Sequence, residues 1–92
     1  MAVERPVTIL NRKGLHVRPA TAFAQEASKF RCSVRVSKDG RSVNGKSVLE
    51  LLMLAAVPGA RVVIQADGDD ADEAVASLAR FVEKRFGMEE DD

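Results

Sequence analysis

The sequence predicts an α+β domain built as an open-faced β-sandwich, in which a four-stranded, largely antiparallel sheet has three helices on one face. Segments with the patterns of strands and helices follow one another in the order strand, helix, strand, strand, helix, strand, helix. An Asp-Gly pair between the two consecutive strands is typical of a tight β-hairpin, which favours antiparallel pairing.

The first third of the chain is expected to contain one strand and one helix. Residues 3–10 are rich in β-branched side chains and predict a strand, and Pro6 near its start indicates either an edge position or a strand that begins after it. Residues 17–29 predict a helix with Pro19 in its first turn, where a missing N–H group is tolerated. The apolar face of this helix comprises Ala20, Phe23, Ala24, Ala27 and Phe30.

A hairpin and a short helix are expected next. Residues 32–37 and 41–43 predict two strands joined by a turn at Asp39-Gly40. Residues 47–54 predict a short helix that ends before Pro58-Gly59. This helix begins with the sequence S-x-x-E, a capping box in which each side chain accepts the other residue's backbone N–H.

The last part of the chain completes the sheet and adds a third helix. Residues 60–66 predict a strand, and residues 70–86 predict a helix with acidic side chains at its start, where they suit the helix dipole. The predicted buried stripe of this helix consists of Ala71, Ala74, Val75, Leu78, Phe81 and Val82.

Length and composition indicate one domain, which we place at residues 1–88, followed by an acidic tail at 89–92. Fourteen basic and fourteen acidic residues cancel, and Trp and Tyr are absent, so the chain is a poor candidate for nucleic-acid binding.

The single Cys32 is expected to be a buried thiol in a reducing compartment. No segment approaches the ~20 apolar residues of a membrane helix, and we expect a cytoplasmic location.

The only histidine, His16, lies in the run Gly-Leu-His-Val-Arg-Pro-Ala at residues 14–20, where a loop leads into a helix. A helix start offers backbone N–H groups and the positive end of the dipole, and Arg18 adds a planar cation suited to phosphate oxygens. Imidazole can be neutral and nucleophilic near pH 7. A capping histidine and a surface arginine are the alternatives. Because residues two apart do not face each other on a regular helix, contact between Arg18 and a phosphate requires an open first turn or a movement of Arg18.

Residues 14–20 closely resemble the active-site signature of the HPr family, the histidine-containing phosphocarriers of the bacterial phosphoenolpyruvate-dependent phosphotransferase system. The resemblance extends over nearly the whole chain. Residues 25–30 resemble the end of the family's first helix, residues 44–48 the start of its second, and residues 66–71 the entry to its last. Val17 departs from the smaller residue that often lies between the histidine and the arginine.

The resemblance implies a carrier and not an enzyme with turnover of its own. His16 would accept a phosphoryl group on Nδ1 from enzyme I and pass it to IIA-type domains of sugar permeases, while Arg18 stabilises the group. We expect a monomer without cofactor. The helix that follows residue 47 is apolar nearly all round, which predicts an exposed partner surface on the side that does not pack against the sheet. The positions that match the family's docking residues are Val48, Leu49 and Leu52.

Ser47 matches the family's regulatory serine, which an ATP-dependent HPr kinase/phosphorylase modifies in many Gram-positive relatives. The capping box gives the same serine a purely structural role. A phosphate on Ser47 would add about −1.5 to −2 charges, which the helix dipole favours and nearby Glu50 opposes.

Other functions stay open on the sequence alone. Residues 40–47 match the P-loop pattern G-x-x-x-x-G-K-S of nucleotide-binding proteins, although Gly40 is explained by the hairpin turn and residues 41–43 are expected in a strand. A ferredoxin-like regulatory module explains the first six elements but not the last helix or His16. A nitrogen-type regulatory carrier of the HPr family is a further alternative, weakly favoured by the apolar run at 51–54. His16 and Cys32 lack metal-ligand spacing.

Overall fold

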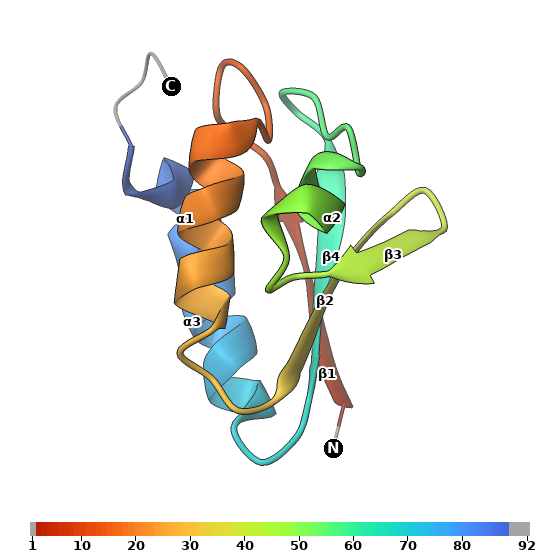
Figure 1. The fold of residues 1–92 in the computed structure, drawn as a ribbon, viewed down its shortest axis with the longest axis vertical. Coiled ribbons are helices and arrows are strands. Elements are labelled where there is room, and N and C mark those ends of the chain that lie inside the picture. The colour runs from red at the N-terminus through yellow and green to blue at the C-terminus, as the bar shows by residue number, and fades with distance from the viewer. Residues whose placement is uncertain (1, 89–92) are drawn as a thin grey trace.

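The computed structural model describes residues 2–88, and within them one face of an antiparallel sheet is covered by helices (Figure 1). The strands are β1 (Ala2–Thr8), β2 (Ser33–Lys38), β3 (Arg41–Asn44) and β4 (Arg61–Asp67). The helices are α1 (Val17–Ala27), α2 (Val48–Leu52) and α3 (Ala71–Glu83), with a 3-10 turn over Arg85–Gly87. The predicted open-faced sandwich and its element order are confirmed. The expected tail at 89–92 lies outside the described residues.

The sheet has the strand order β1-β4-β2-β3, with every pairing antiparallel. β1 is therefore an edge strand, which is one of the two alternatives that Pro6 indicates. The central pairing sets Val36 opposite Ile64, both of them buried beneath the helices. The turn of the β2–β3 hairpin lies at Asp39-Gly40, where both residues have positive φ, +52° and +83°.

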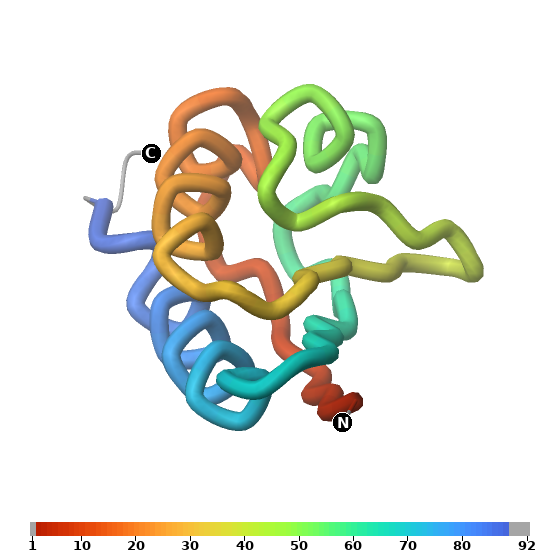
Figure 2. The backbone as a smooth tube through the Cα atoms, turned by 60° about the horizontal axis from the view of Figure 1, so that its bottom comes forward, coloured from red at the N-terminus to blue at the C-terminus, as the bar shows by residue number. Residues whose placement is uncertain are grey.

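The apolar stripes of the long helices face the sheet, and α1 and α3 lie side by side on it (Figure 2). Nearly all the residues predicted to be buried are buried. The exceptions are Phe30 and Phe81, which are half-buried at the margin of the core.

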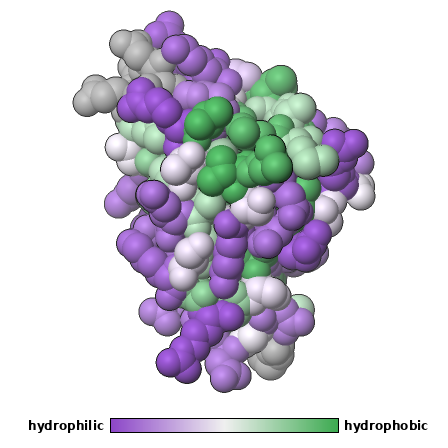
Figure 3. Space-filling model, viewed as in Figure 1, coloured by the Kyte–Doolittle hydropathy of each residue, from purple (hydrophilic) through white to green (hydrophobic). Residues whose placement is uncertain are grey.

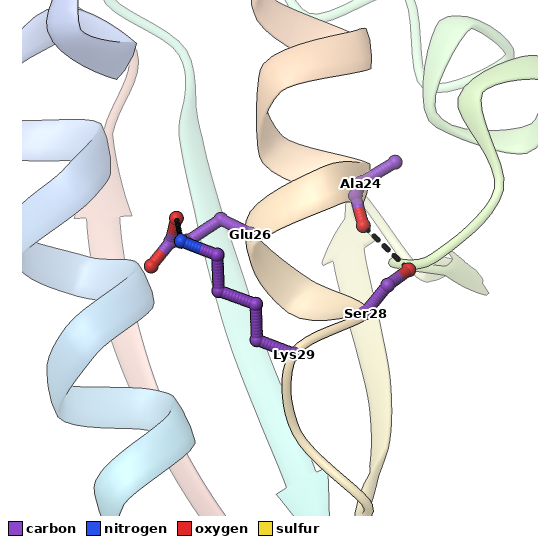
Figure 4. Close-up of polar contacts among 4 residues, drawn as sticks. All are labelled: Ala24, Glu26, Ser28 and Lys29. Atoms are coloured by element: carbon purple, nitrogen blue, oxygen red, sulfur yellow. Dashed lines mark hydrogen bonds and ion pairs between the residues drawn. The ribbon is translucent and has the colours of Figure 1, made fainter.

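α1 ends at Ala27, two residues before the predicted end. Ser28 closes the helix, because its hydroxyl donates to the carbonyl of Ala24 at 2.8 Å (Figure 4). The Lys29 ammonium pairs with the Glu26 carboxylate at 2.9 Å beside this turn (Figure 4).

The prediction that the last helix extends to Phe86 is wrong. α3 ends at Glu83, and Arg85 and Phe86 have left-handed backbone, with φ of +55° and +58°. The reversal turns the Phe86 ring into the core, where its centroid lies 6.3 Å from that of Phe23 and 5.9 Å from that of Phe81. Burial of an aromatic ring therefore decides where this helix ends.

The connection from α1 to β2 is tied to the start of α3 by one carboxylate. Asp70 accepts the backbone N–H groups of Arg31 and Cys32, each at 2.9 Å. These hydrogen bonds, that from Arg31 foremost, lower the pKa of Asp70. Cys32 is buried as predicted, and its burial, together with the neighbouring Asp70, raises the pKa of its thiol.

The helices within residues 2–88 are too short or too polar to span a bilayer.

Candidate functional site

The loop before α1 is held against the segment that connects α2 to β4. Ile9 donates its N–H to the carbonyl of Ala60 at 2.9 Å, and Leu15 donates to the carbonyl of Ala56 at 2.9 Å. The loop and the connecting segment lie side by side at the same end of the molecule (Figures 1 and 2). The backbone immediately before His16 is thus positioned by residues about 40 positions later in the chain.

Gly14 permits this close approach. Its φ is +71°, and a Cβ atom at this position would lie 2.5 Å from the oxygen of Ala56 and 3.1 Å from the Cα of Val57. Both neighbours are backbone atoms, so no side-chain movement relieves the clash. Glycine is therefore required two residues before the histidine.

Asn11 ties the same loop to the C-terminal turn. Its side chain is 1% exposed, and Nδ2 donates to the carbonyl of Arg85 at 3.3 Å. Its backbone carbonyl accepts the N–H of Gly14 at 3.0 Å. Sequence reasoning missed this residue, because its partner lies 74 residues away and only the folded chain brings the two together.

His16 is the N-cap residue of α1 and not a member of the helix. Its backbone is extended, with φ −104° and ψ −168°, and its carbonyl accepts the N–H of Ala20 at 3.0 Å. The side chain makes no capping hydrogen bond to the helix. The residue is half-buried, and Nε2 is its covered nitrogen, without a hydrogen-bond partner among residues 2–88.

The first turn of α1 has the features that favour an anion. The N–H groups of Val17 and Arg18 lie at the positive end of the helix dipole, and the turn contains no acidic side chain. Arg18 is exposed at the second position of the helix. Because His16 precedes the helix in extended backbone, the spacing rule for two residues on a regular helix does not apply to His16 and Arg18.

Ser47 is the N-cap of α2, and it makes half of the predicted capping box. Its Oγ accepts the N–H of Glu50 at 3.2 Å. The reciprocal bond is absent, because Glu50 Oε1 accepts the N–H of Asn44 at 3.0 Å, and Ser47 donates its own N–H to the carbonyl of Asn44 at 3.2 Å. The carboxylate thus closes the turn between β3 and α2 instead of returning to the serine.

The P-loop pattern at residues 40–47 does not form a phosphate cradle. Half of it is strand β3, and Gly45 packs against β2, with its N–H bonded to the carbonyl of Val34 at 2.8 Å. The Lys46 ammonium donates to the carbonyl of Phe30 at 2.7 Å. The match to the pattern is explained by hairpin and packing requirements.

An apolar patch lies next to the histidine. Figure 3 shows hydrophobic side chains gathered over α2 and the start of α1, with hydrophilic side chains around them. Leu49 is 73% exposed, Val17 58% and Met53 56%, whereas Val48 and Leu52 are half-buried at their side. We call these five residues the apolar patch. The sequence analysis did not predict that Val17 and Met53 belong to an exposed apolar surface.

Across residues 2–88, no group of three or more His, Cys, Asp and Glu side chains is arranged to hold a metal ion. The candidate site combines one imidazole, a helix start and an arginine, and it lies beside the apolar patch. These features define a class of small α+β domain in which one histidine lies at a helix start beside an apolar surface patch.

Comparison with known proteins places the chain within that class. Residues 3–84 match the family model described as PTS HPr component phosphorylation site. The chain is 39% identical over 85 residues to phosphocarrier protein HPr of Cupriavidus necator, covering 92% of this chain and 96% of that protein. It is also 39% identical over 82 residues to the HPr-like protein Crh of Halalkalibacterium halodurans, covering 89% and 98%.

A solved structure agrees with the sequence relatives. The crystal structure of HPr-C-His from Thermoanaerobacter tengcongensis superimposes with a TM-score of 0.89 at 41% identity, covering 95% of this chain and 98% of that one. The chain belongs to the HPr family of phosphocarrier proteins.

Proposed function

We propose that this chain is a phosphocarrier that accepts a phosphoryl group on His16 from phosphorylated enzyme I and passes it to IIA-type domains. The observation that supports this function best is the position of His16. It precedes α1, its side chain does not cap the helix, and its Nε2 is buried. Nδ1 is then the nitrogen that we expect a donor to reach.

The site supplies what a reversible phosphoryl transfer needs. The lone pair of Nδ1 attacks phosphorus, the N–P bond forms, and the bond between phosphorus and the donor's leaving group breaks. Transfer to the acceptor reverses these roles, so that the imidazole leaves. The first-turn N–H groups of α1 and the Arg18 guanidinium stabilise the charge on the phosphoryl oxygens.

Partner docking is assigned to the apolar patch. A carrier must leave donor and acceptor quickly, which suits a small apolar surface surrounded by polar side chains. Val48, Leu49 and Leu52 are the docking residues within the patch, and Leu49 is the most exposed of the three. We expect the chain to act as a monomer, which light scattering after gel filtration tests directly.

The function is tested by incubating the chain with phosphoenolpyruvate and cognate enzyme I, followed by intact-mass analysis. We expect an acid-labile gain of one phosphate that disappears in His16→Ala, since the chain has only one histidine. Self-phosphorylation of enzyme I is the control for donor activity. No mass gain with an active donor would contradict the proposal.

The acceptor is proposed to be the IIA-type domain of a sugar permease. Phosphorylated chain, freed of enzyme I, is chased with purified IIA domains of both the sugar branch and the nitrogen-type regulatory branch. Rapid transfer to the sugar-branch domain supports the proposed acceptor. Transfer only to the regulatory domain would replace that acceptor, while the role of His16 would stand.

Ser47 is proposed as a second, regulatory modification site. Its hydroxyl is half-buried and already caps α2, so a kinase must free it from the Glu50 N–H before or during transfer. Incubation with cognate HPr kinase/phosphorylase and ATP tests this role. The expected product is an acid-stable phosphate that is absent in Ser47→Ala, and an unmodified chain with an active kinase would contradict it.

A further inference from the structure

Two basic side chains of the β2–β3 hairpin reach the end of α2. Arg41 donates from Nη1 to the carbonyl of Met53 at 2.8 Å, and Lys38 donates from Nζ to the carbonyl of Leu54 at 3.3 Å. Met53 is the C-cap of α2 and Leu54 follows it, so both carbonyls lie just past the last helical residue, Leu52, and have no partner within the helix. The two cations therefore hold the C-terminal end of α2, which lies beside β3 (Figure 1).

The chain just beyond these carbonyls has an unfavourable conformation. Ala55 has a φ of +52°, in the left-handed region that residues with a Cβ atom rarely adopt. A segment with this backbone requires fixed contacts on both sides. Arg41 and Lys38 provide the contacts on one side.

The contact on the other side is with the loop at residues 9–16, which leads from β1 to α1. Ala56, which follows the left-handed residue, accepts the N–H of Leu15 at 2.9 Å, and its oxygen leaves no room for a side chain at position 14. Leu15 immediately precedes His16. Hydrogen bonds and the chain itself thus link the hairpin, through the end of α2, to the histidine.

We propose that Arg41, assisted by Lys38, is a positioning residue for His16 that acts by fixing residues 53–56. Its guanidinium holds the end of α2, the end of α2 fixes the carbonyl of Ala56, and that carbonyl fixes the backbone that presents the imidazole. The kinetic part of this proposal rests on the proposed phosphocarrier function, whereas the structural part does not.

Arg35 offers a matched control within the same hairpin. Its guanidinium binds Ser42 twice, from Nε to Oγ at 2.8 Å and from Nη2 to the carbonyl at 3.0 Å, and both bonds stay inside the hairpin. Arg35→Gln and Arg41→Gln remove the same charge from neighbouring strands. Only Arg41→Gln removes the contact with α2.

The first test measures amide hydrogen exchange of Leu15 in the isolated chain. In Arg41→Gln we expect exchange about three- to tenfold faster than in the parent, the range for loss of one hydrogen bond of ordinary strength, with amides of the central strand β4 unchanged. Arg41→Lys should restore most of the protection, and Arg35→Gln should leave Leu15 unaffected. Equal acceleration in Arg35→Gln, or acceleration of all amides together, would overturn the proposal.

The second test measures phosphorylation of the same variants by enzyme I. Displacement of the nucleophile predicts that Arg41→Gln lowers kcat about three- to tenfold with KM for the carrier unchanged, while Arg35→Gln changes neither. A changed KM with constant kcat would overturn the positioning role in favour of docking by charge. If the parent chain accepts no phosphate, the proposed phosphocarrier function is wrong. The exchange rate of Leu15 then still shows whether Arg41 fixes the backbone before His16.

Discussion

The starts of α1 and α2 contrast within one small domain. The N-cap of α1 is His16, whose side chain makes no capping bond, and the first turn of α1 has no acidic residue. The N-cap of α2 is Ser47, which accepts the N–H of Glu50 at 3.2 Å, and Glu50 places a carboxylate in that turn. In α2, the side chain of Ser47 satisfies one backbone N–H of the first turn. In α1, the side chain of His16 satisfies none and does not serve as a cap.

This difference supports the different roles that we propose for the two helices. A phosphate at the start of α1 meets backbone donors and Arg18 without displacing a cap. A phosphate on Ser47 would be attached to an oxygen that already accepts the N–H of Glu50, and it would lie near the Glu50 carboxylate. We therefore assign phosphoryl transfer to the start of α1, and docking with optional regulation to α2.

The largest effect is expected from Gly14→Ala, which disturbs the start of α1. The new Cβ meets the Ala56 oxygen, and the left-handed φ adds strain, so we predict a loss of about 2–4 kcal/mol in unfolding free energy. Gly40→Ala is the control, because its φ is also positive but a Cβ there meets no atom within 4 Å; we expect about 1 kcal/mol. Urea denaturation measures both. Equal losses would show that contact with Ala56 is unimportant.

Next in size is Arg18→Gln, which leaves the start of α1 intact but removes its cation. The rate of phosphorylation by enzyme I should fall by about 10–10²-fold, because one charged stabiliser of the phosphoryl oxygens is lost. Lys13→Gln is the control, because it removes the same unit of charge from an exposed side chain on the preceding loop, and it should have little effect. A normal rate in Arg18→Gln would mean that the helix start alone stabilises the group.

A smaller effect is predicted for Ser47→Ala, which makes the start of α2 resemble that of α1. Loss of the cap to Glu50 should cost about 1 kcal/mol of unfolding free energy, and Ser47→Asp should restore most of it. Phosphorylation of His16 should continue at the parent rate in Ser47→Ala, which adds no charge beside the docking residues. A large drop in that rate would mean that the two helix starts are coupled.

The smallest effect at neutral pH is expected from Asp70→Asn, at the start of the third helix. Asp70 makes no capping bond to α3 and instead accepts the N–H groups of Arg31 and Cys32, which lower its pKa. A lowered folded-state pKa means that its stabilising contribution is present above the ordinary value of about 3.9 and is lost as pH falls through the folded-state value. Urea midpoints of parent and variant should therefore differ at pH 7 and converge in acid. A constant difference would contradict this account.

The sequence was sufficient for the fold because its signals are local. Alternation in the strands, the helical stripes and the Asp39-Gly40 turn predict the element order, and all act within a few residues. The end of α3 was not predictable from such signals. Periodicity continues to Phe86, but burial of that ring against Phe23 requires the chain to leave the helix.

For the candidate site, sequence reasoning proposed His16 and Arg18 but did not predict the contacts that position the loop before them. Gly14 was recognised only as part of a motif, whereas its approach to Ala56 depends on a contact across the fold. The buried Asn11 and the reach of Arg41 to α2 depend on segments far apart in sequence. The local S-x-x-E pattern predicts that the Glu50 carboxylate accepts the N–H of Ser47. In the structure this carboxylate accepts the N–H of Asn44 instead.

We propose above all that a phosphoryl group is held at the start of α1 on Nδ1 of His16, the nitrogen other than the buried Nε2. This proposal is tested most directly by long-range ¹H–¹⁵N NMR of the imidazole, before and after phosphorylation by enzyme I and phosphoenolpyruvate. The account predicts that phosphorus is attached to Nδ1 and that Nε2, buried in the unmodified chain, carries no phosphate. Phosphate on Nε2, or an unchanged imidazole with an active donor, would contradict it.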